Sequence, residues 1–309
     1  MKKILSDKTK RTNAATYLLV IVAFAIMQTL YSLGALGSAM KGYLIPICAY
    51  VVLAVSLNLL VGICGELSLG HAGFMGIGAF TGIIVASVTA SVIPNTVLRL
   101  TVAMFAGGLM AGIMGFLVGI PVLRLRGDYL AIVTLAFGEI VRSLFRNAPA
   151  EMFGGTLAMP TPRYDRNSLF IIGFILVLLT VVVIQNFIRS KHGRAVTSIR
   201  DSEIAARATG INVTKYKLLA FILSATFAGV AGVLYSFSNY TVQSAKFGYN
   251  YSIEILVMVV LGGMGSINGS IIAAALITFL NTKLATILTG DLAVLQNLFY
   301  ALILIIIVI

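Results

Sequence analysis

The chain has 309 residues, of which 59% are hydrophobic and only 10% are charged. Soluble domains carry about 25% charged residues, so this composition excludes an ordinary soluble domain and indicates an integral membrane protein. The net charge of +12 does not indicate a nucleic-acid partner, because the basic residues gather in short segments between apolar runs, as the positive-inside rule expects.

Apolar runs of roughly 20 residues recur along the chain, and this is the length that crosses a bilayer as an α-helix. Residues 1–13 are polar and basic and are expected to form a cytoplasmic tail. We expect residues 14–309 to form one all-α, polytopic transmembrane domain with eight to ten spans. The ten apolar segments are 14–33, 43–63, 72–92, 101–120, 129–147, 168–187, 218–237, 252–264, 269–288 and 292–309.

The distribution of basic residues predicts the orientation of these spans. With ten spans and a cytoplasmic N-terminus, most basic residues lie inside, in the tail, in the turn with Arg124 and Arg126, and in residues 189–217. Residues 148–167 then form the longest external loop. Two spans are marginal, because 129–147 contains Glu139, Arg142 and Arg146 and 252–264 is short.

Two dense glycine clusters, residues 58–82 and 261–270, interrupt the apolar pattern, one in each half of the chain. Paired interruptions of this kind mark the substrate path of transporters, since backbone groups freed at membrane depth must face protein or a water-filled cavity. The alternative is that each glycine simply allows two helices to approach closely. Taken together, the clusters favour a path. The candidate path residues are Gly65, Glu66, Ser68, Gly70, His71 and Gly73 in the first cluster and Gly262, Gly263, Gly265 and Ser266 in the second.

The sequence contains no pattern of catalytic or metal-binding residues. It has only two histidines and no Gly-Lys dipeptide, so it lacks both a multi-histidine metal site and a Walker A loop. We therefore expect no enzyme activity, no cofactor and no metal, and energy from an ion gradient or from a partner. Carboxylates at membrane depth would favour an ion gradient. Each candidate has another explanation: Glu66 lies near an interface, Glu139 can pair with Arg142, and Glu254 can complement a helix N-terminus.

Residues 189–217 are the most polar part of the chain and are expected to form a cytoplasmic loop. Within it, Ser198 is a candidate N-cap, and Gly210 is a candidate C′ residue, so the sequence predicts one helix over 199–209. This helix would present Ile204, Ala205 and Ala208 as a small apolar face. Such a face favours docking into a groove of another protein over binding to lipid headgroups. The residues flanking it are Arg200, Glu203, Ala206 and Arg207.

Several stretches resemble one known family. Glu203-Ile-Ala-Ala-x3-Gly210 resembles the Glu-Ala-Ala-x3-Gly motif in permeases of ABC importers, with Ile204 in place of the first alanine. GELSLGHAGFMGIGAF at 65–80 resembles the signature of the branched-chain amino-acid permease family of the LivM and LivH type. The segments 123–142, 210–221 and 260–274 resemble its LivM branch, and the resemblance runs in order over about residues 45–305.

The resemblance implies a multi-pass permease of the bacterial inner membrane or plasma membrane. It would work with a second permease subunit, two cytoplasmic ABC ATPase subunits and an extracytoplasmic binding protein that delivers leucine, isoleucine or valine. The coupling of ATPase to permease would fall on Glu203, Ala205, Ala206 and Gly210, with Arg200 and Arg207 beside them. Residues 154–162 match the family only loosely.

Other functions stay open at this stage. Related permeases move urea, amides or other amino acids, and a related ABC family moves sugars. A carrier driven by an ion gradient and a scaffold that transports nothing are the alternatives from other classes.

Overall fold

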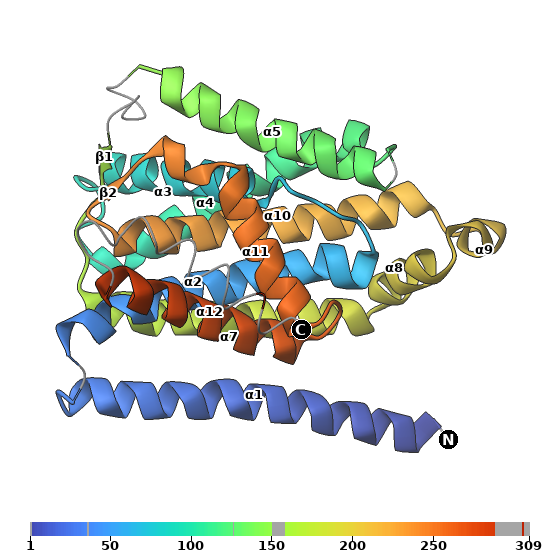
Figure 1. The fold of residues 1–309 in the computed structure, drawn as a ribbon, viewed down its shortest axis with the longest axis horizontal. Helices are drawn as coiled ribbons and strands as arrows, with labels where there is room; N and C mark the ends of the chain where they lie inside the picture. Colours follow the sequence, from blue (N-terminus) through green and yellow to red (C-terminus); the bar gives the residue numbers. More distant parts are fainter. Residues whose placement is uncertain (1, 36, 126, 150–157, 288–304, 306–309) are drawn as a thin grey trace.

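The computed structural model describes residues 2–35, 37–125, 127–149, 158–287 and 305. Most of its long helices lie roughly along the long dimension of the bundle, and α11 crosses them steeply (Figure 1). The first half contains α1 (Lys2–Ser32), α2 (Ser38–Asn58), η1 (Leu59–Cys64), α3 (His71–Val88), α4 (Thr96–Val122) and α5 (Asp128–Asn147). The second half contains β1 (Met159–Pro160), α7 (Arg166–Arg189), α8 (Lys191–Asp201), α9 (Glu203–Ala208), α10 (Val213–Ser238), β2 (Thr241–Val242), η2 (Ser244–Phe247), α11 (Tyr249–Gly262) and α12 (Ile267–Ile287).

Within the described residues, 6 helices are long and apolar enough to cross a membrane. They are α2 together with η1, α3, α4, α7, α10 and α12. The apolar part of α1 and helix α11 are shorter, α5 carries the charged residues noted above, and the expected segment 292–309 lies almost entirely outside the described residues. The all-α polytopic fold is therefore confirmed, whereas the number of spans stays a prediction.

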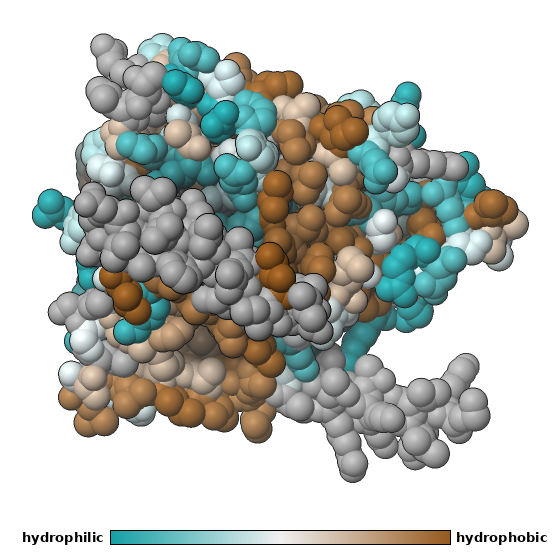
Figure 2. Space-filling model, in the orientation of Figure 1, coloured by the Kyte–Doolittle hydropathy of each residue, from teal (hydrophilic) through white to brown (hydrophobic). Residues whose placement is uncertain are grey.

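Figure 2 shows apolar residues across the middle of the bundle and polar residues towards both of its ends, one of which carries α8 and α9. At the opposite end β1 pairs antiparallel with β2 (Figure 1). Helix α1 begins at Lys2, so the segment predicted as a tail is helical and continuous with the first apolar run.

Glycine lets the central helix α10 pack closely against α3 and α4. A Cβ added at Gly78 would lie 2.1 Å from the carbonyl oxygen of Gly229, and one added at Gly232 would lie 2.0 Å from that of Met75. Real Cβ atoms do not approach backbone this closely, so these helices touch through their backbones. The close-packing role of small residues at regular spacing is thus confirmed for this part of the bundle.

Candidate functional site

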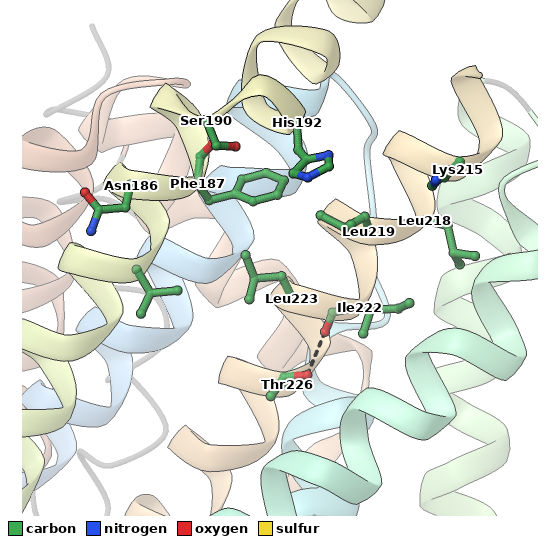
Figure 3. A pocket seen from close by; sticks show the side chains of 11 residues that line it. Asn186, Phe187, Ser190, His192, Lys215, Leu218, Leu219, Ile222, Leu223 and Thr226 are labelled. Carbon is green, nitrogen blue, oxygen red and sulfur yellow. Dashed lines mark hydrogen bonds between the residues drawn. The ribbon is translucent and has the colours of Figure 1, made fainter. Parts of the chain in front are cut away.

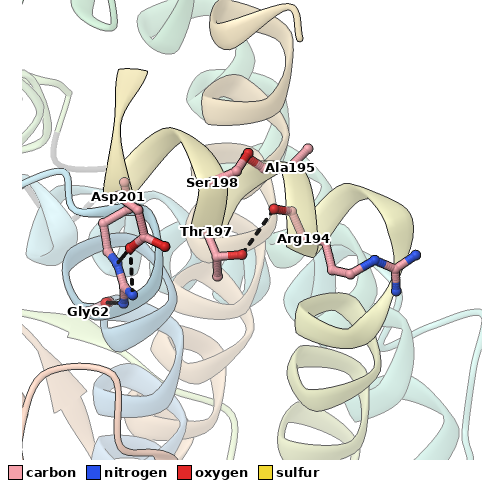
Figure 4. Close-up of polar contacts among 7 residues, drawn as sticks. Gly62, Arg194, Ala195, Thr197, Ser198 and Asp201 are labelled. Carbon is pink, nitrogen blue, oxygen red and sulfur yellow. Dashed lines mark hydrogen bonds and ion pairs between the residues drawn. The ribbon is translucent and has the colours of Figure 1, made fainter. Parts of the chain in front are cut away.

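The predicted helix over 199–209 is wrong in one respect, because the structure has two helices there. Helix α8 ends at Asp201 and α9 begins at Glu203, with Ser202 extended between them. The hydroxyl of Ser202 caps α9 by accepting from the amide of Ala205 (3.3 Å). Ser198 is not a cap: it lies inside α8, where its hydroxyl donates to the carbonyl of Ala195 (2.9 Å; Figure 4).

The predicted end of this region is confirmed. Gly210 has a φ of +82°, a left-handed conformation that glycine adopts without strain. The amide of Ile211 donates to the carbonyl of Ala206 (3.0 Å), which closes the last turn of α9.

Helix α9 presents a small apolar face at the molecular surface. Ile204 is 85% exposed, and Ala205 and Ala208 are exposed beside it. Ala206 points the other way and packs with Ile199 and Val213 in a small buried cluster. We call Ile204, Ala205 and Ala208 the α9 face. One buried alanine therefore seats the helix, while its apolar surface stays accessible.

A buried lysine links α9 to the first glycine cluster. Lys217 lies in the second turn of α10, and its side chain is 7% exposed. Its ammonium forms an ion pair with Glu66, whose side chain is 10% exposed, and another with Glu203 (3.1 Å). Glu203 in turn pairs with Arg207 (2.6 Å). Buried charges persist only where they are paired, so these four residues form one charge network with no net charge.

Arg200 makes a second link between the same parts of the chain. Its Nη1 donates to the carbonyl of Gly62 (3.0 Å), and its Nη2 pairs with Asp201 (3.0 Å; Figure 4). Gly62 lies in η1, a π-helical turn, where the i to i+4 hydrogen bonds of the α-helix are interrupted. Gly65 follows with a φ of +78°, and a Cβ there would lie only 2.8 Å from Cγ of Arg200.

The two glycine clusters contact each other directly. The Nδ2 atom of Asn58 donates to the carbonyl of Ser266 (3.0 Å) and to the hydroxyl of Ser270 (2.8 Å). Its Oδ1 accepts from the amide of Gly265 (2.7 Å). A Cβ added at Gly62 would lie 2.1 Å from that same amide nitrogen. Segments from the two halves of the chain are thus joined at one point.

Most of the first cluster is buried packing in this conformation. A Cβ at Gly70 would lie 2.5 Å from the carbonyl oxygen of Thr134, and one at Gly73 would lie 2.9 Å from Cα of Gly138. Ser68 is buried, and His71 is buried with its Nε2 hydrogen-bonded to the hydroxyl of Ser56 (3.0 Å).

The second cluster lies nearer the surface. Ser266 is exposed, and Gly262, Gly263 and Gly265 are partly exposed. Gly263 and Gly265 have φ values of +88° and +86°, so both need the conformational freedom of glycine. Gly262 packs on the backbone of Gly269.

Of the two other candidate carboxylates, Glu139 has the predicted ion-pair partner and Glu254 has a different role. Glu139 pairs with Arg142 (2.6 Å), as expected, and also accepts from the amide of Tyr249, the first residue of α11 (2.9 Å). Glu254 was predicted to complement a helix N-terminus, but it lies inside α11 and accepts from Nδ2 of Asn281 (2.9 Å). The N-terminal role at α11 therefore belongs to Glu139.

Glu254 lines a cavity of 570 Å³ between α2, α10, α11 and α12. We call it the tyrosine cavity, because Tyr50, Tyr235 and Tyr251 form one wall with ring centroids 5.6 to 6.1 Å apart. Lys246, which is exposed, also lines it. The cavity therefore offers a carboxylate, an ammonium group and aromatic rings. In the described residues, no group of three or more His, Cys, Asp and Glu residues could hold a metal ion.

Sequence reasoning missed three elements of this site: Asn58, Lys217 and the tyrosine cavity. The signal for the first two was present, since Asn58 is an amide within a span and Lys217 is a cation near the start of one. Intramembrane cations and polar amides are candidates for function as much as carboxylates are, but the prediction considered only the carboxylates. No local pattern announces the cavity, because four separate helices supply its walls.

Comparison with known proteins bears on the whole chain. A family model described as branched-chain amino acid transport system, permease component, matches residues 39–309. The high-affinity branched-chain amino acid transport system permease protein LivM of Escherichia coli is 38% identical over 260 residues, which cover 74% of this chain and 59% of LivM. The chain thus spans less than two thirds of the length of that relative.

Two further similarities are weaker. The ribose import permease protein RbsC of Escherichia coli is 28% identical over 279 residues, which cover 86% of this chain and 71% of RbsC. A solved chain of PsaBC from Streptococcus pneumoniae in complex with Fab has 14% identity and a TM-score of 0.48, covering 88% of this chain and 92% of its own. A structural similarity at that level carries no argument about the site.

Proposed function

Because the chain belongs to the family of permease components of branched-chain amino acid transport systems, we propose that it is a permease subunit of an ABC importer for leucine, isoleucine and valine. It is a multi-pass protein of the cell membrane. We further propose that its N-terminus and residues 189–217, with α8 and α9, lie in the cytoplasm, and that residues 148–167 lie outside. In this arrangement α1, α5, α11 and 292–309 complete about ten spans.

The proposed partners follow from the same arrangement. Two cytoplasmic ABC ATPases would supply the energy, and one of them would bind at the α9 face of this chain, so the permease itself carries out no catalysis and needs no cofactor. A second permease subunit would complete the path within the lipid bilayer, and an extracytoplasmic binding protein would deliver the substrate. Nucleic acid has no part in this function.

The observation that best supports coupling at α9 is the charge network. A movement of α9 would be transmitted to Lys217 through its ion pair with Glu203, and to Glu66 through its ion pair with Lys217. The hydrogen bond from Arg200 to Gly62 connects the same loop to η1. Gly62 and Asn58 touch the second cluster. Coupling between sites needs a contiguous set of contacts that can adopt two arrangements, and these contacts are contiguous. The two glycine clusters are the segments whose movement would open and close the path.

Transport can be tested in lipid vesicles with the complete complex, formed from this chain and two ABC ATPases, a second permease and a binding protein of the same organism. We expect uptake of radiolabelled leucine that requires ATP and persists when an uncoupler removes ion gradients. Uptake that collapses with the uncoupler at constant ATP would identify a gradient-driven carrier, and absence of any flux would identify a scaffold.

The α9 face gives the first prediction about a single residue. Replacing Ile204 with aspartate would bury an unpaired charge against the ATPase, so we expect association to weaken about thirtyfold, which corresponds to about 2 kcal/mol. Because Ile204 is 85% exposed, the stability of the permease should change by no more than about 0.5 kcal/mol. Co-purification of the ATPases and thermal unfolding measure the two effects.

The control for Ile204→Asp is Ala90→Asp, which places the same charge in an exposed turn after α3, at the far end of that helix from the first glycine cluster. Full ATPase binding by Ile204→Asp, or an equal loss in both variants, would contradict docking at the α9 face.

The tyrosine cavity supports an amino acid rather than a sugar as substrate. An amino acid carries an ammonium and a carboxylate group, and the cavity offers Glu254 and Lys246 for them, while the tyrosine rings suit an apolar side chain. Ribose carries no charge and would leave both residues without a matching group. Import of a sugar is nevertheless the second candidate function, because RbsC is similar over most of the chain and aromatic rings beside amides also suit sugars.

We expect Glu254→Gln and Lys246→Gln each to weaken leucine binding roughly tenfold, because each removes a charge-assisted hydrogen bond. The measurement is equilibrium binding of radiolabelled leucine to the permease complex without its binding protein. Lys246→Gln should abolish the preference for leucine over leucinol, which lacks the carboxylate, and Glu254→Gln the preference over 4-methylpentanoate, which lacks the amine.

Asp128→Asn and Lys283→Gln are the matched controls, since both side chains are exposed and neither lines the cavity. Competition by ribose at leucine-like concentrations would favour the sugar, and unchanged affinity in both cavity variants would place the substrate elsewhere.

A further inference from the structure

A groove of 710 Å³ runs along the surface between α7 and α10, apart from the charge network and the tyrosine cavity (Figure 3). Its long part is apolar and includes Val183, Leu219, Ile222 and Leu223. Thr226 also lines it, but its hydroxyl donates to the carbonyl of Ile222 (2.8 Å), so it adds no unpaired polar group to the groove.

One end of the groove is polar and basic. Ser190, His192 and Lys215 lie there (Figure 3), and among the residues that the structure describes no acidic side chain lines the groove. Lys215 is exposed, and within the described part of the chain it has no ion-pair partner. Ser190 caps α8, so the positive end of that helix dipole lies at the same place.

The position of Lys215 follows from its spacing to Lys217. Two residues along an α-helix correspond to roughly 200° of rotation, so the two lysines of α10 point to opposite sides. Lys217 points inward to the charge network, whereas Lys215 lines the outer groove. The first turns of α10 therefore carry one cation for an internal contact and one for an external anion.

The dimensions of the groove match one leaflet of a bilayer. Lys215 and Thr226 are eleven positions apart on α10, a length of roughly 16 Å at about 1.5 Å per residue. Half of the hydrocarbon core is about 15 Å thick. An acyl chain that lies along the groove would therefore place its phosphate at Lys215, at the level where the basic loop predicts the cytoplasmic headgroups. Basic pockets between membrane helices on this side bind anionic lipid headgroups.

We propose that this groove binds an anionic glycerophospholipid, with an acyl chain along α10 and the phosphate at Lys215 and His192. The hydroxyl of Ser190 donates to the carbonyl of Phe187 (2.7 Å), so Ser190 contributes through the N-terminus of α8 that it caps. The lipid would contact the helix that carries Lys217 and the loop that carries α8. Its presence would stiffen the junction of α7, α8 and α10, from which the charge network reaches α9.

The test is native mass spectrometry of the detergent-purified ABC complex after addition of dioleoyl phosphatidylglycerol or dioleoyl phosphatidylcholine. We expect retained phosphatidylglycerol, and we expect Lys215→Gln to weaken it about fivefold, the change that corresponds to about 1 kcal/mol per basic residue. Lys191→Gln removes a nearby exposed lysine that does not line the groove, and it should have no effect. Leu223→Trp, which fills the apolar part, should release both lipids.

Three results would overturn the proposal. The first is equal retention of the two lipids, and the second is an equal loss in Lys215→Gln and Lys191→Gln, which would indicate general surface charge. The third is efficient disulfide cross-linking of Leu219→Cys to cysteines on the second permease, which would show that a protein covers the groove. Lipid binding is measured without transport, so failure of leucine uptake would not affect this outcome.

Discussion

Replacing Lys217 with methionine is expected to lower the stability of the permease by about 3–5 kcal/mol, the cost of leaving one partner of a buried ion pair without the other. Glu66 is 8% exposed and would lose the cation that compensates its charge. Methionine fills a similar volume, so packing contributes little to the loss. Thermal unfolding of the purified complex measures the change in stability, and ATP-driven leucine uptake measures its effect on transport.

A second substitution tests whether the charge of Glu66 is the cause. In the double variant Lys217→Met with Glu66→Gln no unpaired charge remains, and most of the stability should return. Lys283→Met is the control, since that lysine is exposed on α12. If the double variant were as unstable as Lys217→Met alone, the loss would come from the shape of the side chain rather than from its charge.

Stability and coupling can be separated with Glu203→Gln. This change leaves the ion pair of Lys217 with Glu66 intact and removes the ion pair that links Lys217 to α9. The side chain of Glu203 is 23% exposed. Removing a partly exposed pair costs no more than about 1 kcal/mol, so the protein should fold while uptake falls. Normal uptake in this variant would show that the network has no role in transmission.

Gly62→Ala is expected to have the second largest effect, because it forces apart the contact between the two glycine clusters. The new Cβ would lie 2.0 Å from Oδ1 of Asn58 and 2.1 Å from the amide nitrogen of Gly265. These two atoms are the acceptor and the donor of one hydrogen bond. Overpacking costs about 1–3 kcal/mol, and a buried polar group left unpaired costs about 1–3 kcal/mol more. Thermal unfolding and leucine uptake should both fall.

The same substitution at Gly42 is the matched control. Gly42 lies in α2, in the same candidate span as Gly62, and its new Cβ would meet only the Nη1 atom of Arg166 at 3.9 Å. Alanine is the better helix former by up to about 1 kcal/mol, so Gly42→Ala should be neutral or slightly stabilising. A Gly62→Ala protein as stable and active as Gly42→Ala would mean that the clusters do not need to touch.

The membrane class and the family were predictable because both depend on local patterns. Apolar runs and contiguous motifs can be identified in the sequence without knowledge of the tertiary structure. The all-α polytopic fold and the resemblance to permeases could therefore be predicted. Glycine density likewise located both clusters. The contact between them could not be predicted, because Asn58 and Gly265 are separated by most of the chain and no local sequence pattern at either residue indicates the other.

Errors arose where two local patterns competed. Both Ser198 and Ser202 can cap a helix, and tertiary contacts decide between them: Val196 and Ile199 of α8 are buried, so α8 continues through Ser198 and the break falls at Ser202. Glu254 was assigned to a helix start because hydropathy begins to rise at Ser252, whereas α11 starts at Tyr249. Periodicity and hydropathy locate an apolar segment more reliably than the residue at which its helix begins.

The ion pairs in this region differ in how strongly ionic strength should weaken them. Mobile ions screen exposed charges over about 8 Å in physiological salt but reach buried pairs much less. The side chains of Arg200 and Arg207 are 41% and 57% exposed, whereas those of Lys217 and Glu66 are 7% and 10% exposed. Concentrated salt would therefore weaken the outer arginine contacts, where a partner would bind, and leave the inner pair intact. After the outer contacts are lost in such a medium, Lys217 and Glu66 would still hold α10 to the first glycine cluster.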